Sequence, residues 1–387
     1  AAGGTGTAAA GSSGGLATSG GAAGAGGTGG TAALPADWFD PAWAQRRKVT
    51  VKDPQLTEQL QAFQVPVQLA AQSFDYASAQ SKGEDLRFVT PDGVVLKHEV
   101  EKWDPVGGSL IWLMLPTLGA APVQVWLYSG NALAAAPAES DRRAVWPAPY
   151  SAVWHMAGDV ADSGASAYAA RNVGGTFTDG KLGQGLKLTR SAKQYVVISP
   201  DVPIPIISGA DGSTFSAWVH PANIDGIPGD GTDEQDNGSV LFTVGGHSTD
   251  NHNSYTGYNL SYEGRMITHV DPADQGSYRR VRSAPGVIAV AEWAWVTYVV
   301  DLAAGEVRFY KNGAAAGAVT EGAFNASSYA PEASLQVVIG TEEDLTKHFW
   351  DGSLDELRIE KGLRSASWIA AQYRAMTVPD YVSVTAE

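Results

Sequence analysis

A short segment near residue 100 places carboxylate and indole side chains at alternate positions. The run is His98-Glu99-Val100-Glu101-Lys102-Trp103. On a β-strand Glu99, Glu101 and Trp103 share one face, because successive side chains point to opposite sides. Two carboxylates beside an indole ring can hold a sugar or a cation. The alternative is a polar sheet face with a packed tryptophan, in which Glu99 or Glu101 pairs with Arg87.

Two polar stretches further along the chain hold further candidate ligands. His247, Asp250 and His252 offer imidazole and carboxylate groups for the rim of a metal or sugar site. The acidic stretch 225–237 offers oxygens to a calcium ion, but it lacks the terminal glutamate of an EF-hand loop. The alternative for both is a solvated segment without a ligand.

Short strands between turns must position these residues. Alternating apolar and polar residues recur from residue 45 onward, and helical periodicity is nearly absent. This pattern predicts an all-β chain built from antiparallel β-sandwiches. We expect a Gly/Ala/Ser/Thr-rich tail at 1–36, one β-sandwich at 37–136, an Ala/Pro-rich linker at 137–146 and a second sandwich with a C-terminal tail at 147–387.

The run W-D-G-S-L-D-E-L-R-I at 350–359 is the most distinctive part of the second domain. Earlier runs are T-F-S-A-W-V at 214–219, W-V-T-Y-V-V-D at 295–301 and V-R-F-Y-K-N-G at 307–313. Together they resemble the laminin-G-like, concanavalin A-like jelly-roll family. The resemblance implies that 350–359 is a central strand. It also implies a role in binding carbohydrate or protein, since members of this family occur in surface proteins and adhesins.

The same resemblance implies a calcium site. In related jelly rolls an early Asp meets the Asp of an Asp-Glu pair on the closing strand, which here are Asp162 (or Asp159) and Asp355. Calcium binds several oxygens at once. The alternative is that Asp355 and Glu356 hydrogen-bond to loops or pair with Arg358.

The first domain resembles a bacterial domain of unknown function. That family occurs beside laminin-G-like domains and beside TolQ/ExbB-type channel proteins. The resemblance is carried by short runs between Trp43 and Asn131, among them H-E-V-E-K-W-D at 98–104 and Y-S-G-N at 128–131. It implies no chemistry.

The chain carries no complete enzyme motif in the expected context. Glucanases of this fold carry Glu-x-Asp-x-x-Glu on one strand, as nucleophile and acid. In the closest string, 353–358, Ser353 and Arg358 stand at the two Glu positions. The string at 11–15 matches Gly-x-Ser-x-Gly, but it lies in the small-residue tail. The string at 175–181 matches Gly-x-x-x-x-Gly-Lys, but it continues with Leu182 instead of the Ser or Thr of a phosphate-binding loop. The absence of cysteine excludes thiol catalysis and disulfides. We therefore predict a protein that is not an enzyme.

The amino-acid composition limits the classes of partner that this protein can bind. With 26 basic and 41 acidic residues the net charge is -15, which argues against nucleic acid. No apolar run reaches the roughly 20 residues of a membrane-spanning helix. Only 17% of residues are charged, while Gly, Ser and Thr are abundant. This composition is typical of a secreted or cell-surface bacterial protein, whose partner we expect to be carbohydrate or a surface protein.

The tail consists of small residues and has almost nothing to bury. Residues 1–33 contain only Gly, Ala, Thr, Ser and Leu16, which is typical of a flexible spacer. From Gly21 to Gly30 every third residue is glycine, so this run can also pack closely against other backbones. The alternative function is therefore a structural subunit of an extracellular filament or coat, whose tail docks onto a neighbouring copy.

Overall fold

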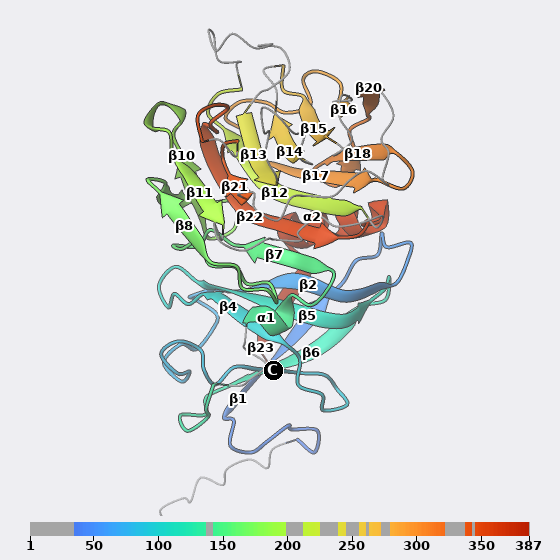
Figure 1. Ribbon diagram of the computed structural model, residues 1–387. Helices are drawn as coiled ribbons and strands as arrows, with labels where there is room; N and C mark the ends of the chain where they lie inside the picture. The colour runs from blue at the N-terminus through green and yellow to red at the C-terminus, as the bar shows by residue number, and fades with distance from the viewer. Residues whose placement is uncertain are drawn as a thin grey trace, which may run out of the picture. The chain divides into compact units, whose positions relative to one another are not determined.

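The fold is described from a computed structural model. It describes residues 35–136, 142–198, 212–224, 239–244, 255–260, 263–271, 279–321, 337–342 and 345–386. Residues 39–387 form one compact unit. Within it the described strands make four antiparallel sheets, which follow one another as layers (Figure 1). The all-β prediction of two sandwiches is therefore confirmed. None of the helices in these residues has the length and apolarity to cross a membrane.

The first sandwich consists of a four-stranded and a three-stranded sheet. The first has the order β23-β1-β6-β3, with β1 (Gln45–Val51), β3 (Arg87–Val89), β6 (Val123–Ser129) and β23 (Val382–Ala386). The second has the order β2-β5-β4, with β2 (Leu60–Leu69), β4 (His98–Lys102) and β5 (Ser109–Leu118). Alternate apolar residues of both sheets, such as Val49, Val65 and Leu113, form one buried core between them.

The C-terminal segment belongs to the first sandwich. We expected it to be a tail of the jelly roll, but β23 pairs with β1 from Arg47 to Val51. Helix α2 (Ala366–Thr377) precedes it and buries Trp368 in the same core. Asp53 fixes this return, because it accepts hydrogen bonds from Arg374 and Tyr381. The jelly roll therefore ends near residue 361, and the residues after it belong to the first sandwich.

The second sandwich also has two sheets. The one nearer the first sandwich has the order β19-β18-β17-β12-β22-β10-β9, and β7 also pairs with β22. Its strands are β7 (Tyr150–Trp154), β9 (Thr176–Asp179), β10 (Gln184–Leu188), β12 (Ser213–Pro221), β17 (Ala294–Asp301), β18 (Glu306–Lys311), β19 (Ala314–Ala315) and β22 (Gly352–Lys361).

The outer sheet of this sandwich has the order β20-β16-β15-β14-β13-β21-β11-β8. Its strands are β8 (Ala170–Val173), β11 (Tyr195–Ile198), β13 (Ser239–Val244), β14 (Tyr255–Leu260), β15 (Met266–Asp271), β16 (Arg279–Arg282), β20 (Val319–Glu321) and β21 (Val337–Ile339). Two short helices complete the described elements, α1 (Arg142–Val145) and the 3-10 helix η2 (Arg190–Ala192). Aromatic and branched side chains such as Phe215, Phe242 and Ile339 fill the space between the two sheets.

Strand β22 is central, as the sequence predicted. One edge pairs with β12, and the other pairs with β10 at Gly352–Leu354 and with β7 at Leu357–Glu360. Both faces are covered, so nearly every residue of β22 is buried. Leu354, Leu357 and Ile359 enter the jelly-roll core. The opposite face packs against the first sandwich.

Candidate functional site

The two sandwiches meet in an interface rich in tryptophan. Its buried apolar residues come from both domains and from α2, and they are Leu110, Trp112, Val145, Trp146, Tyr150, Val153, Leu182, Trp218, Trp295 and Met376. Among these rings lie six ionisable side chains, which we call the interface cluster: Glu99, Glu101, His155, Asp355, Glu356 and Arg358. Charged groups are rarely buried unless they are paired. Because six ionisable side chains are gathered there, the interface is the candidate functional site in the part of the chain that the structure describes.

Strand β4 contributes two glutamates to the interface. The pairing of β4 with β5 shifts register between Val100 and Lys102, which is a β-bulge with one extra residue. Glu99 and Glu101 both contact interface tryptophans, since Trp146 and Trp112 donate their indole N–H groups to them at 2.7 Å each. The expectation that these two glutamates share a face is confirmed.

Trp103 does not share that face, so this part of the prediction is wrong. Its ring lies 5.0 Å from Tyr76 and 5.9 Å from Phe74, beside the core of the first sandwich. The physical reason is the bulge, because one extra residue reverses which way the following side chain points. The proposed partner Arg87 donates to the backbone carbonyls of residues 84, 86 and 135.

A second bulge places the acidic pair of β22. The register of β12 against β22 shifts between Ser216 and Trp218, and Glu356 has a positive φ of 52°. That conformation is strained for a residue with a side chain and is retained where surrounding contacts over-determine it. The extra residue turns both Asp355 and Glu356 away from the jelly-roll core, although they are adjacent in sequence.

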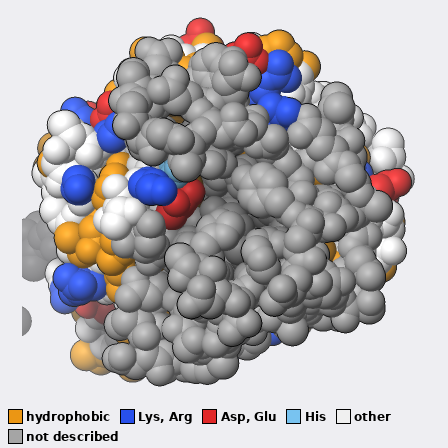
Figure 2. Space-filling view, turned by 45° about the horizontal axis from the view of Figure 1, so that its top comes forward, with side chains coloured by type: hydrophobic (Ala, Val, Ile, Leu, Met, Phe, Trp, Pro, Cys, Tyr) orange, Lys and Arg blue, Asp and Glu red, His pale blue; other side chains and the backbone are white. Residues whose placement is uncertain are grey.

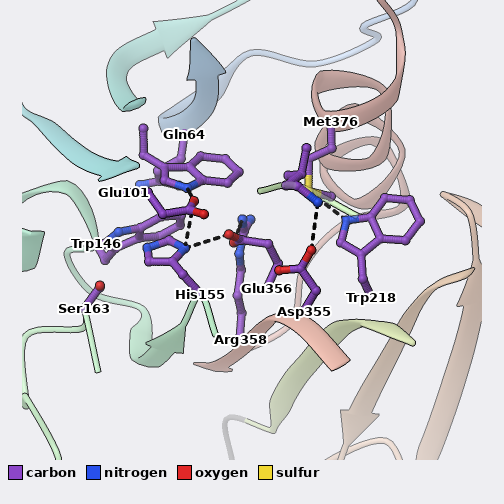
Figure 3. Close-up of polar contacts among 12 residues, drawn as sticks. Gln64, Glu101, Trp146, His155, Ser163, Trp218, Asp355, Glu356, Arg358 and Met376 are labelled. Atoms are coloured by element: carbon purple, nitrogen blue, oxygen red, sulfur yellow. Dashed lines mark hydrogen bonds and ion pairs between the residues drawn. The ribbon is translucent and has the colours of Figure 1, made fainter. Parts of the chain in front are cut away.

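His155 connects the carboxylates of the two domains. It follows Trp154, which points into the jelly-roll core, so its own ring points to the interface. Its Nδ1 lies 2.7 Å from Oε1 of Glu356 and 3.6 Å from Oε2 of Glu101, and its Nε2 lies 3.2 Å from Oε2 of Glu99. Figure 3 shows the imidazole between Glu101 and Glu356.

Arg358 carries the second buried cation. It donates to Oε2 of Glu356 at 2.6 Å. Its guanidinium carbon lies 4.6 Å from the ring centre of Trp112, 4.8 Å from that of Trp146 and 5.6 Å from that of Trp295. Aromatic faces attract a guanidinium, so the tryptophans stabilise a charge that is removed from water. The predicted alternative, a Glu356–Arg358 pair, is what the structure contains.

The surroundings divide the four carboxyls into two kinds. Burial raises the pKa of Glu101 well above its usual value, and the charge of Glu356 raises it further. Burial and Glu356 likewise raise the pKa of Asp355 well above normal. Burial opposes ionisation of Glu356 and Glu99 as well, but His155 outweighs it and leaves both pKa values lowered.

The imidazole responds in the opposite direction to its burial. Burial lowers the pKa of His155, but the charges of Glu356 and Glu99 together raise it well above its usual value. The two carboxyls with lowered pKa values, Glu99 and Glu356, thus face His155 and Arg358, whereas burial disfavours the charged forms of Glu101 and Asp355. Such a balance satisfies the rule that buried charges occur in pairs.

A cleft leads toward this cluster from the surface. It has a volume of about 280 Å³, and its lining includes Gln68, Lys102, Ser109 and Gly183. Gly183 also lies near one carboxyl oxygen of the cluster, since a Cβ at this position would lie 3.1 Å from Oε1 of Glu101.

The residues predicted to hold calcium have backbone partners. Asp162 accepts hydrogen bonds from the N–H groups of Val153, Gly164 and Tyr168. Asp159 is exposed and accepts from the N–H of residue 161.

The third predicted calcium residue, Asp355, is fully buried. Its Oδ2 accepts from the N–H groups of Lys181 and Leu182, at 2.7 and 2.8 Å. This is the predicted alternative in which the carboxylate hydrogen-bonds to a loop.

One group of described residues has the composition and spacing to hold a metal ion. Ligand atoms of Glu101, His155 and Glu356 lie within 4.8 Å of one another. The three predicted calcium residues are outside this group, and calcium binding stays a prediction. His247, Asp250 and His252, and the stretch 225–237, lie outside the described residues.

Comparison with known proteins identifies the two domains. Residues 190–370 match the family model of the concanavalin A-like lectin/glucanases superfamily. Residues 82–150 match the model of a domain of unknown function, DUF2341. No curated protein matches this chain.

Several solved structures are similar to the chain at low identity. Domain 4 of the extracellular GH43 arabinanase AbnA from Geobacillus stearothermophilus, in complex with arabinotriose, is 18% identical, with a TM-score of 0.41; the match covers 58% of this chain and 98% of that one. The receptor-binding domain of botulinum neurotoxin type G is 12% identical, with a TM-score of 0.40 and coverage of 58% and 50%. The binding domain of Paraclostridial mosquitocidal protein 1 is 12% identical, with a TM-score of 0.39 and coverage of 58% and 51%. The matched region spans about half the length of these two toxin structures.

The family matches agree in position with the sandwich that contains β4 and β5 and with the sandwich that contains β12 and β22. The chain therefore contains a DUF2341 domain followed by a concanavalin A-like domain.

Proposed function

We propose that this chain is a non-enzymatic binding protein, secreted or tethered at a bacterial cell surface, that recognises carbohydrate or protein through its jelly roll with the help of calcium. The observation that carries the proposal is the concanavalin A-like fold together with the lectin/glucanase family match over residues 190–370. Fold alone does not fix function, so the location of the reactive groups must be considered as well.

The interface cluster is unsuited to cleaving a polysaccharide. A glycosidase needs two carboxyl groups on either side of a bound sugar. Here Glu99 is 2% exposed, Asp355 and Glu356 are 0% exposed, and all three are surrounded by protein partners. This arrangement supports a structural or ion-binding role for these acids and a binding role for the jelly roll.

The packing of the domains directs recognition to the outer sheet. The inner sheet presents Trp218 and Trp295 to the first sandwich, so that face is covered. The outer sheet contains β13 and β14, and residues 245–254, with His247, Asp250 and His252, join these two strands in the chain. We place ligand recognition there. In the described part of the surface that Figure 2 draws, charged and hydrophobic side chains are interspersed, without a broad basic patch.

A binding screen tests this function. The full chain is applied to a panel of glycans and matrix proteins in calcium and again in a chelator. We expect a specific ligand whose signal falls at least ten-fold in the chelator and in the variant H247A/D250A/H252A. Asp92→Asn, in an exposed turn of the first sandwich, is the control and should bind like the wild type.

Two outcomes would contradict the proposal. Absence of binding to the whole panel in calcium removes the lectin-like function. Release of reducing ends from any polysaccharide would establish an enzyme instead.

The alternative function is assembly through the tail. Residues 1–33 lie outside the described residues, and the glycine spacing of the sequence is what favours this proposal. Light scattering and negative-stain imaging compare the intact chain with a chain lacking 1–33. Ordered polymers from the intact chain alone support a filament or coat subunit, whereas identical monomers make the tail a spacer. The association with TolQ/ExbB-type channels stays a prediction.

A further inference from the structure

The interface cluster has the donor set of a transition-metal site. We propose that Glu101, His155 and Glu356 bind one divalent transition-metal ion, with Zn²⁺ the best match, and that this ion links the two sandwiches. Glu101 comes from the first sandwich, while His155 and Glu356 come from the second. Imidazole nitrogen and carboxylate oxygen are both donors that Zn²⁺ accepts, and three of them would leave a fourth position for water.

The three ligand atoms lie within 4.8 Å of one another, so a bound ion requires small movements of the side chains. Zinc–ligand bonds of about 2.0–2.2 Å in a tetrahedron hold the ligand atoms roughly 3.3–3.6 Å apart. Nδ1 of His155 lies 3.6 Å from Oε2 of Glu101, which already fits. The same nitrogen lies 2.7 Å from Oε1 of Glu356, where a hydrogen bond now occupies the place of the ion. An outward movement of this oxygen by roughly 0.6–0.9 Å would reach the spacing of a zinc site.

An unpartnered oxygen points to a missing ligand. Among the described residues, Oε1 of Glu101 is buried without a hydrogen-bond partner, and the side chain is only 2% exposed. Leaving a buried polar atom unsatisfied costs about 1–3 kcal/mol, so native proteins rarely retain one without a function. A cation beside Glu101 would satisfy Oε1, since Oε2 already accepts the indole N–H of Trp112 at 2.7 Å. The raised pKa of this carboxyl has the same origin, since burial and Glu356 disfavour its charge when no ion is present.

The outer contacts of the imidazole support metal binding at Nδ1. A ligating histidine commonly donates its other N–H to a carboxylate, which fixes the ring. Here Nε2 of His155 faces Oε2 of Glu99 at 3.2 Å. Glu99 is held in turn by the indole N–H of Trp146 and by the hydroxyl of Ser163, at 2.7 and 2.8 Å. This leaves Nδ1 as the nitrogen that faces the other two carboxyl groups.

The types of donor atom favour one kind of metal ion. Calcium and magnesium prefer shells of oxygen alone, so an imidazole at the centre of the group favours Zn²⁺ over either. The absence of cysteine leaves histidine and carboxylates as the strong donors of this chain. The lining of the cleft includes Lys102, which follows Glu101 in the chain, and Gly183, whose backbone lies near Oε1 of Glu101, so we take the cleft as the entry path from solvent.

The test uses the full chain after treatment with a chelator. Zn²⁺ is titrated by calorimetry, and Co²⁺ is titrated by its visible absorption, which reports nitrogen and oxygen coordination in a tetrahedral site. We expect one equivalent of each ion per chain. Glu101→Gln should weaken binding at least 100-fold, and Glu99→Gln, which changes only the outer contact, should weaken it about 10- to 100-fold.

Matched controls separate this site from others. His348→Asn removes a second buried histidine that faces a carboxylate, Glu342 at 3.4 Å, and it should bind like the wild type. The variant H247N/D250N/H252N should also keep the ion, although the same residues are expected to matter for glycan binding. Failure of the metal site and failure of the proposed function are therefore distinguishable.

Three results would overturn the inference: a chelator-treated wild type that takes up no Co²⁺ or Zn²⁺, a Glu101→Gln chain that binds as the wild type does, or loss of the ion from the H247N/D250N/H252N variant alone. Circular dichroism verifies the fold of each variant. If Glu101→Gln does not fold, the stoichiometry and Co²⁺ spectrum of the wild type and the response to Glu99→Gln decide the question.

Discussion

The interior of the jelly roll and the interface between the sandwiches are both buried, but they are built differently. In the jelly-roll core Phe215 stacks on Phe242 and Tyr258, with ring centres 5.5 and 4.6 Å apart. In the interface, Glu356 contacts His155 and Arg358 through charged hydrogen bonds. Apolar packing is non-directional and tolerates similar shapes. A buried charge needs its particular partner, so the interface depends on one arrangement of the two domains and can respond to ions and pH.

The largest expected effect comes from removing a charge of the interface. Arg358→Met leaves Glu356 with His155 as its remaining cationic partner. It also removes the guanidinium that lies over three tryptophan rings. Breaking a buried ion pair from one side costs about 3–5 kcal/mol. We expect the free energy of unfolding in urea to fall by this amount. Arg171→Met, at an exposed position of β8, is the control and should cost under about 0.5 kcal/mol. A loss below 1 kcal/mol for Arg358→Met would show that the interface charges are dispensable.

The second prediction concerns pH. The pKa of His155 is raised above its usual 6.5 in the folded chain, so the folded state binds more protons than the unfolded state above that pH. Its stabilisation is complete below pH 6.5 and is lost as pH rises toward the folded pKa, with a limiting slope of about 1.4 kcal/mol per pH unit. The raised pKa values of Glu101 and Asp355 act in the same direction. We therefore expect unfolding free energy, measured by urea denaturation, to decline from pH 6.5 to 9.

Two variants test whether this pH response belongs to the interface. His155→Gln should flatten the decline above pH 6.5, because the titrating group is gone. Phe215→Leu, in the jelly-roll core, should lower the whole curve by about 1 kcal/mol without changing its shape. On the acid side, Glu99 and Glu356 have lowered pKa values, so their stabilisation is lost as pH falls below about 4.5. Parallel curves for wild type and His155→Gln would assign the pH response to other groups.

The smallest expected effect concerns helix α2, which packs in the core of the first sandwich and in the interface. Ser365 caps α2 by accepting a hydrogen bond from the N–H of Trp368, and α2 contributes Trp368 to the first core and Met376 to the interface. Ser365→Ala should lower the free energy of unfolding by about 1 kcal/mol. The control is Ser367→Ala, two residues further along and inside the first turn of α2, which should change the free energy of unfolding by less than about 0.5 kcal/mol. Equal effects of the two changes would contradict the capping role.

Both bulges can be recognised in the sequence as a local departure from strict alternation of apolar and polar residues. Leu354 and Leu357 enter the same core at a spacing of three, and Val100 and Trp103 pack beside the other core at the same spacing. A spacing of three between inward residues of one strand indicates an extra residue between them. That reading of the sequence would have placed Trp103 apart from Glu101. It would not have found His155, because its partners come from strands about 50 and 200 residues away.

The sequence by itself determined the β-rich architecture, the two sandwich units and the central position of β22, because alternation, turns and family motifs are local features of the chain. It did not determine which sandwich the C-terminal strand joins, since β23 and β1 are separated by almost the whole domain pair. Tertiary structure also decided that Glu101 and Glu356 meet at one imidazole. Their long-range packing removes these groups from water, and burial is what gives ordinary glutamates and a histidine their altered pKa values and the geometry of an ion site.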